Sequence, residues 1–215
     1  MYRRNNKTFP SGLCFITDIN SSPLTCLEMT LIALRAGVRW VQYRQKDKSR
    51  RQLYEEALGL RRLTADFGAV FIVNDYADIA AAVDADGVHL GQDDLPIAEA
   101  RKVMGGDRII GISTHSIKEA VEAESAGADY IGFGPVFPTL TKDAGEPKGV
   151  KSLREIKQAV RIPVVAIGGI SLKNLPSVIS AGADSVAVAS AILKGDIEEN
   201  AGEFLRRIGK FSRKI

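Results

Sequence analysis

The chain has 215 residues, of which 45% are hydrophobic and 26% are charged, and its formal net charge is only +3. Such a length and composition are typical of a globular protein with one large domain, and the low net charge argues against a nucleic-acid partner. The apolar runs fall short of the ~20 residues that a membrane span requires, and the basic N-terminus lacks the apolar run of a signal peptide. We therefore expect a cytoplasmic protein without a membrane partner.

Eight short β-rich runs alternate with amphipathic or alanine-rich stretches along the chain. The predicted strands are Leu13–Thr17, Val38–Tyr43, Ala69–Val73, Gly87–Leu90, Arg108–Ile112, Tyr130–Phe133, Val164–Ile167 and Ser185–Val188. The predicted helices are Leu24–Ala36, Arg50–Phe67, Asp75–Val83, Ile97–Met104, Ile117–Ala126, Val150–Val160, Leu172–Ala181 and Ile197–Ile208. Largely apolar strands such as Val164–Ile167 indicate a sheet that is covered on both faces.

The alternation of eight strands with helices predicts an α/β protein with the fold of a (β/α)8 TIM barrel. Three predicted helices end in an alanine and a glycine that turn the chain back into a strand, at Gly37, Gly127 and Gly182. An open, doubly wound sheet is the alternative, but its glycine-rich phosphate turn is missing after the first strand. We assign residues 1–215 to a single domain, with residues 1–11 as an N-terminal extension and residues 209–215 as a basic C-terminal tail.

Polar residues gather at the predicted C-terminal ends of the strands, which is where TIM barrels bind their ligands. Gln42, Arg44 and Lys46 alternate along the end of the second strand and would share one face. An amide, a guanidinium and an ammonium on one face form an anion site, in which Arg44 can bind two phosphate oxygens. A solvated cluster of charges is the alternative interpretation.

Carboxylates follow the third and fourth predicted strands. Asp75 ends the third strand after Asn74, and the loop after the fourth strand carries Asp93 and Asp94. Adjacent strands lie ~4.8 Å apart, so Asp75 and a carboxylate of the next loop can meet at one magnesium ion. The alternative for Asp75 and for Asp93 is a role as the cap of the helix that follows each of them.

Hydroxyl groups mark the end of the fifth predicted strand. Ser113 is placed to donate a hydrogen bond to a ligand. Ser116 stands three residues before Glu119, which forms a capping box, so we assign Ser116 a structural role. We expect His115 to pack or to cap.

The loop after the sixth predicted strand carries two hydroxyls and an ammonium within four residues, on Thr139, Thr141 and Lys142. Such a set suits a phosphorylated ligand, and a plain surface turn is the alternative. Pro135 and Pro138 are expected to stop the loop from pairing as a strand.

The seventh and eighth strands end in a pattern that is common to phosphate-binding barrels. Gly168 and Gly169 would let the backbone approach a phosphate closely, and Ser190 would begin a short helix. The mouth of the barrel therefore suits two phosphorylated ligands, or one ligand that is phosphorylated at both ends. No Ser-His-Asp or Cys-His pairing is evident, so covalent nucleophilic catalysis is unsupported.

Four motifs stand in a fixed order along the chain: Gln42-x-Arg44-x-Lys46, Asn74-Asp75, Gly87-Val88-His89-Leu90-Gly91-Gln92-x-Asp94 and Gly134-Pro135-Val136-Phe137-Pro138-Thr139-x-Thr141-Lys142. With these motifs the chain resembles the thiamine phosphate synthase family over nearly its whole length. One departure is Ala189, at a position where the family commonly has a larger aliphatic residue.

The resemblance implies roles for three groups of residues. The pyrimidine diphosphate site would comprise Gln42, Tyr43, Arg44, Gln45, Lys46, Asn74, Ser113 and Lys142. The thiazole phosphate site would comprise Thr139, Leu140, Thr141, Gly169, Ala189 and Ser190. Asp75 and Asp94 would hold one Mg²⁺ per active site. Among these residues, Arg44, Ser113 and Lys142 would be catalytic.

The reaction that the resemblance implies is a transfer between two small phosphorylated substrates. The methylene of 4-amino-2-methyl-5-(diphosphooxymethyl)pyrimidine is joined to the ring nitrogen of 4-methyl-5-(2-phosphoethyl)thiazole, which releases diphosphate and forms thiamine phosphate. The alternatives are a thiazole tautomerase, whose group has a histidine at the position of Pro135, and a non-catalytic barrel that binds thiamine precursors. The sequence leaves a homodimer open.

Overall fold

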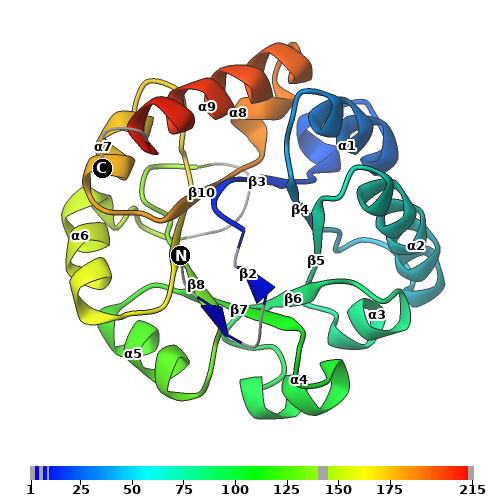
Figure 1. Cartoon of the computed structure of the whole chain (residues 1–215), viewed down its shortest axis with the longest axis horizontal. Helices are drawn as coiled ribbons and strands as arrows, with labels where there is room; N and C mark the ends of the chain where they lie inside the picture. Colours follow the sequence, from blue (N-terminus) through cyan, green and yellow to red (C-terminus); the bar gives the residue numbers. More distant parts are fainter. Residues whose placement is uncertain (1–2, 5–6, 9, 140–144, 213–215) are drawn as a thin grey trace.

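Eight parallel strands close into a barrel in the order β10-β3-β4-β5-β6-β7-β8-β9 (Figure 1). The computed structural model describes residues 3–4, 7–8, 10–139 and 145–212, and the side chains of residues 10–139 and 145–210. The barrel strands are β3 (Gly12–Ile16), β4 (Trp40–Tyr43), β5 (Val70–Asn74), β6 (Gly87–Leu90), β7 (Ile109–Thr114), β8 (Tyr130–Phe133), β9 (Val164–Ile167) and β10 (Ser185–Val188). Outside the barrel, β1 (Arg3–Arg4) and β2 (Lys7–Thr8) form a separate antiparallel pair.

Helices surround the barrel on its outer side (Figure 1). They are α1 (Cys26–Arg35), α2 (Arg50–Asp66), α3 (Ala77–Ala82), α4 (Ile97–Met104), α5 (Ile117–Ser125), α6 (Gly149–Ala159), α7 (Leu175–Ser180), α8 (Ser190–Leu193) and α9 (Ile197–Ser212), with a 3-10 helix η1 at Ile19–Ser21. Capping boxes begin α1 at Thr25 and α2 at Ser49. Ser116 caps α5 as predicted, but the predicted capping box is not formed, because the Glu119 side chain accepts from the N–H of His115 and not from that of Ser116. The predicted TIM barrel is therefore confirmed.

Three helices start later than the sequence pattern predicts. α1 begins at Cys26 instead of Leu24, because Thr25 caps it. α3 begins at Ala77 instead of Asp75, because Asp75 adopts a left-handed backbone conformation with a φ of 67°. α7 begins at Leu175 instead of Leu172, because the side chain of Asn174 forms hydrogen bonds with the backbone of the preceding loop. Side-chain bonds of this kind compete with the helix for backbone groups and so shorten it.

Side chains at alternate strand positions fill the inside of the barrel. They form a cluster of buried residues: Cys14, Ile16, Trp40, Ile72, Ile109, Tyr130, Val165 and Ala187. The rings of Trp40 and Tyr130 meet edge to face, with centroids 5.5 Å apart. Gly111 of β7 pairs with Tyr130 of β8, and a Cβ at Gly111 would lie only 2.1 Å from Cζ of the tyrosine ring. The glycine therefore leaves the space that the large ring fills.

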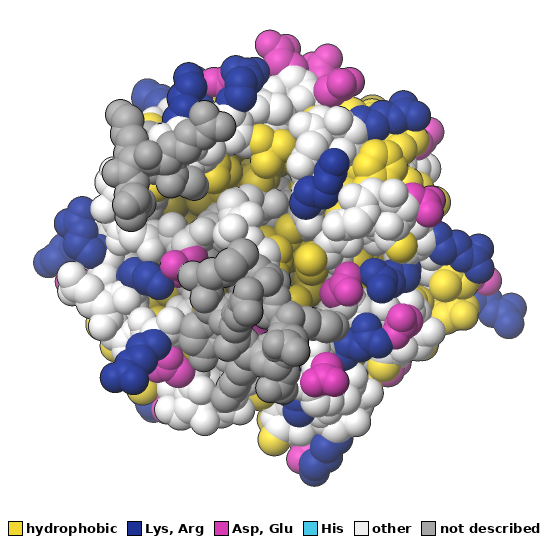
Figure 2. Space-filling model, in the orientation of Figure 1, with side chains coloured by type: hydrophobic (Ala, Val, Ile, Leu, Met, Phe, Trp, Pro, Cys, Tyr) yellow, Lys and Arg dark blue, Asp and Glu magenta, His cyan; other side chains and the backbone are white. Residues whose placement is uncertain are grey.

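The surface carries charges of both signs. Figure 2 shows lysines and arginines interspersed with aspartates and glutamates around the edge of one face, over the helices that surround the barrel. Among the described residues, no helix combines the length and the apolar character that crossing a membrane requires.

Gly111→Ala should destabilise the fold, because the added methyl group would overlap the Tyr130 ring, and such overpacking costs about 1–3 kcal/mol. Gly202→Ala in α9 is the matched control, since nothing lies within 4 Å of a Cβ at that position. The control should stabilise the protein by roughly 0.5–1 kcal/mol. Urea unfolding followed by circular dichroism measures both changes, and equal midpoints would contradict this packing of the barrel interior.

Candidate functional site

The C-terminal ends of the strands surround a cavity of about 180 Å³. Six predicted site residues line it: Arg44, Ser113, Thr139, Gly169, Ala189 and Ser190. They lie at or beyond the ends of β4, β7, β8, β9 and β10, and Ile16 of β3 also lines the cavity, so its walls come from six strands. The cavity therefore lies at the end of the barrel where TIM-barrel proteins bind their ligands.

Two glycines after β9 bring the backbone of one wall close to the loop that follows β8. Gly168 and Gly169 have φ angles of 92° and 62°. A Cβ on Gly168 would lie 2.5 Å from Cα of Pro135, and a Cβ on Gly169 would lie 2.4 Å from the carbonyl oxygen of Pro138. Only glycine suits both the backbone conformation and the available space. Gly169 and Ser190, the first residue of α8, line the same cavity, which brings together the residues predicted to form a phosphate site.

The described residues of the loop after β8 form no strand, as predicted, although two of their N–H groups form hydrogen bonds with the end of β9. The N–H of Val136 donates to the carbonyl of Ile167 at 2.9 Å, and the N–H of Phe137 donates to the carbonyl of Gly168 at 3.0 Å. The prolines stand on either side of these two residues, so both donors remain available. These hydrogen bonds bring Thr139 to the cavity. The predicted site residues Leu140, Thr141 and Lys142 lie outside the described residues.

The end of β4 carries the residues predicted to bind an anion, and it lies across the barrel from β8. Gln42 is buried inside the barrel, and Arg44 is half-buried and lines the cavity. Nζ of Lys46 lies 3.7 Å from Oδ2 of Asp75, at the end of the neighbouring strand β5. The guanidinium and the ammonium are therefore held at the mouth of the barrel, although half of the Lys46 side chain is exposed.

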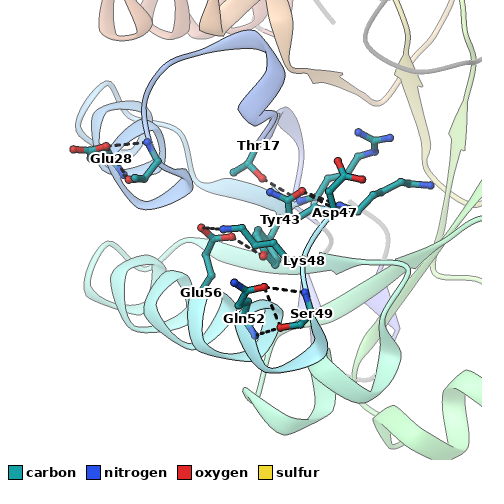
Figure 3. A network of polar contacts seen from close by, with 12 residues as sticks. Thr17, Glu28, Tyr43, Asp47, Lys48, Ser49, Gln52 and Glu56 are labelled. Atoms are coloured by element: carbon teal, nitrogen blue, oxygen red, sulfur yellow. Dashed lines mark hydrogen bonds and ion pairs between the residues drawn. The ribbon is translucent and has the colours of Figure 1, made fainter.

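A network of hydrogen bonds fixes the segment that carries Arg44 and Lys46 to the surrounding elements (Figure 3). Tyr43 and Lys48 both donate to the carboxylate of Glu56 in α2, at 2.7 Å and 2.9 Å. Between them, the N–H of Arg44 donates to Oγ1 of Thr17 at 3.0 Å. Burial and the bond to Glu56 raise the pKa of Tyr43 well above its usual value. The Tyr43 side chain thus faces α2 and anchors the segment.

Gln45 shapes the same segment from within. Its side chain is buried, and Oε1 accepts hydrogen bonds from the N–H groups of Lys46 and Asp47, at 2.9 Å and 3.3 Å. Both bonds bend the chain just beyond β4. Of the predicted residues in this segment, Arg44 and Lys46 present their charges to the mouth of the barrel, whereas the side chains of Tyr43 and Gln45 support the turn.

Asp75 and Asp94 lie at the ends of adjacent strands. The N–H of Asp75 donates to the carbonyl of His89 in β6 at 2.8 Å, and Oδ2 of Asp94 accepts from the N–H of Gly91 at 2.6 Å. The helices that follow, α3 and α4, both begin without a side-chain cap. The capping alternative is therefore wrong for Asp75 and for Asp93.

The donor set at this edge fits magnesium. Two carboxylates supply hard oxygen ligands, and the Asp75 carboxylate already lies beside the Lys46 ammonium and the amide of Asn74, which donates to it. Among the described residues, no group of three or more His, Cys, Asp or Glu could hold a metal ion. A metal held by Asp75 and Asp94 would therefore also need oxygens from a ligand and from water, which is the usual coordination of magnesium.

Two residues without an assigned role, His89 and Tyr130, form hydrogen bonds that lead from Ser113 into the barrel interior. Nε2 of His89 lies 2.9 Å from Oγ of Ser113, and Nδ1 lies 2.8 Å from the hydroxyl oxygen of Tyr130. His89 is 7% exposed and Tyr130 is 1% exposed. The alternation of side chains along the strands could have indicated both residues from the sequence. For example, Val88 and Leu90 share one face of β6, so the side chain of His89 between them lies on the opposite face.

His115 lies nearer to the site than expected. It lines the cavity, and its Nδ1 lies 2.6 Å from the carbonyl oxygen of Gly134, at the start of the loop after β8. Its backbone N–H donates to Glu119 at 2.8 Å. His115 thus connects the end of β7 to the loop after β8.

Comparison with known proteins agrees with this geometry. The family model described as thiamine monophosphate synthase matches residues 13–192. The thiamine-phosphate synthase of Methanosarcina barkeri is 49% identical over 195 residues, which cover 90% of this chain and 88% of that protein. The thiamine-phosphate synthase of Chlorobium luteolum is 48% identical over 202 residues, which cover 94% of each protein. The solved structure of thiamine phosphate pyrophosphorylase from Pyrococcus furiosus matches with a TM-score of 0.86 at 40% identity and covers 93% of this chain and 96% of that one. The chain belongs to the thiamine monophosphate synthase family.

Proposed function

We propose that the chain catalyses the condensation of 4-amino-2-methyl-5-(diphosphooxymethyl)pyrimidine with 4-methyl-5-(2-phosphoethyl)thiazole to form thiamine phosphate and diphosphate. The observation that carries the proposal is that one cavity is lined by Arg44 from the end of β4 and by Gly169 and Ser190 from the ends of β9 and β10. These walls suit the diphosphate of one substrate and the phosphate of the other. The enzyme acts in the cytoplasm.

The reaction needs stabilisation of a leaving group more than it needs a base. The thiazole nitrogen attacks with its lone pair and forms a C–N bond to the pyrimidine methylene, while the C–O bond to diphosphate breaks and its electron pair leaves with the diphosphate. Because the attacking nitrogen carries no proton, no general base is required. The Arg44 guanidinium and the Lys142 ammonium stabilise the charge that grows on the diphosphate.

Asp75 and Asp94 hold the magnesium ion. When bound, the ion supplies positive charge that stabilises the diphosphate oxygens. The protein itself positions the thiazole against the methylene and excludes water, which would otherwise capture the pyrimidine in place of the thiazole. Thr139 and Thr141 bind the thiazole phosphate, and Lys142 binds the diphosphate. The loop after β8 therefore contacts both substrates.

The direct test combines the purified protein, both phosphorylated precursors and magnesium. Thiamine phosphate and diphosphate should appear in equal amounts, and neither should appear when one precursor is left out. Isomerisation of a thiazole carboxylate phosphate would identify a tautomerase, and binding of the precursors without turnover would identify a regulator. Either result, with no thiamine phosphate formed, would overturn the proposal.

Lys142→Ala should lower the turnover number by two orders of magnitude or more, since loss of one group that stabilises developing charge typically costs about 10²–10³-fold. Lys151→Ala is the matched control, because Lys151 is an exposed lysine on α6. Steady-state kinetics with both precursors measures the two variants. Similar turnover for both would remove Lys142 from the leaving-group role.

Asp75→Asn should raise the magnesium concentration that gives half-maximal activity by at least tenfold, because the amide removes one anionic ligand. Asp78→Asn in α3 is the control, since Asp78 pairs with Arg50 on the exposed surface. Activity is titrated against magnesium for both variants and for the wild type. A magnesium response of Asp75→Asn that matches the wild type would argue against this ligand assignment.

A further inference from the structure

A chain of four side chains crosses the inside of the barrel and ends at the cavity. Gln42 of β4 forms a hydrogen bond with Tyr130 of β8. The Tyr130 hydroxyl lies 2.8 Å from Nδ1 of His89 in β6, and Nε2 of His89 lies 2.9 Å from Oγ of Ser113 in β7. Gln42, Tyr130 and His89 are buried, whereas Ser113 lines the cavity. One end of this hydrogen-bond chain is therefore enclosed, and the other end lies at the cavity.

A neutral His89 donates through one ring nitrogen and accepts through the other, so the hydrogen bonds along this row of side chains can point in only two directions. In the outward direction, the Gln42 amide donates to the tyrosine oxygen, Tyr130 donates to Nδ1, and Nε2–H donates to Ser113. The serine hydroxyl then keeps its own proton for an acceptor in the cavity. In the inward direction, Ser113 donates to Nε2, Nδ1–H donates to the tyrosine, and the serine offers the ligand only lone pairs.

The chemistry of the substrates favours the outward direction. The cavity serves phosphorylated substrates, whose ionised oxygens accept hydrogen bonds and do not donate them. A serine that donates suits these ligands, whereas a serine that offers only lone pairs would repel them.

We propose that the hydrogen bonds between these four side chains point outward, each group donating to the next from Gln42 to Ser113. His89 is then a positioning residue that makes the Ser113 hydroxyl a donor to the pyrimidine diphosphate substrate. This inference rests on the proposed function for the identity of the substrate. Gln92 supports the same serine, since its Nε2 donates to the Ser113 carbonyl at 2.6 Å. The geometry therefore fixes both the backbone and the hydroxyl of Ser113.

The tautomer of His89 tests the direction without any substrate. The protein has two histidines, His89 and His115, and we expect them to be opposite tautomers. His115 should carry its proton on Nδ1, because its partner, the carbonyl of Gly134, can only accept. His89 should carry its proton on Nε2. Long-range ¹H–¹⁵N correlation NMR of the ¹⁵N-labelled protein reads both tautomers, and a His115→Asn variant assigns the signals. Protonation of Nδ1 of His89, alone or together with Nε2, would overturn the proposal.

A double-mutant cycle tests the positioning role. His89→Leu removes the donor and should lower kcat/KM for the pyrimidine substrate by roughly tenfold, the value of about one hydrogen bond. His89→Gln keeps an N–H donor and should recover part of this loss. In a Ser113→Ala background, His89→Leu should lower kcat/KM by less than about twofold, because its target hydroxyl is gone. A tenfold loss in both backgrounds would overturn the positioning role. The NMR result decides the direction of the chain even if the protein forms no thiamine phosphate.

Discussion

The closure of eight parallel strands is the constraint on which the site depends. Because the strands all run in one direction, their C-terminal ends meet at one rim, and because side chains alternate, every second residue points inward. Gly111 yields space to the Tyr130 ring, and Tyr130 in turn bonds to His89. The packing of the barrel interior therefore positions the groups that contact Ser113 at the cavity, and a change of register on one strand would turn the polar groups of that strand outward.

The rim divides into two sides that suit two different anions. The side at β4 and β5 offers Arg44, Lys46 and the carboxylate of Asp75, which suit a diphosphate with a metal ion. The side at β9 and β10 offers glycine backbone and a helix start, which suit a single phosphate. The reaction breaks a C–O bond to diphosphate and needs no base. The site therefore accelerates it mainly by stabilising the charge on the leaving group and by positioning the two substrates.

The strand ends were the predictable part of this molecule, and the side-chain chemistry between strands was not. Periodicity placed all eight strands, and the alternation of Gln42, Arg44 and Lys46 indicated a site at the end of β4. It could not show that the Tyr43 hydroxyl and the N–H of Arg44 anchor that segment, since their partners Glu56 and Thr17 come from other elements. For the same reason His89 received no role: its partners, Ser113 and Tyr130, are 24 and 41 residues away in the chain. Asp75 was ambiguous until the structure showed that α3 begins without a side-chain cap.

A crystal structure with thiamine phosphate, diphosphate and magnesium tests the central claim most directly, because it shows which side of the rim binds which anion. The account predicts diphosphate beside Arg44 and Lys46, the metal between Asp75 and Asp94, and the phosphate of thiamine phosphate on the backbone near Gly169 and Ser190. Diphosphate bound at Gly169, or a metal that contacts neither carboxylate, would contradict the account.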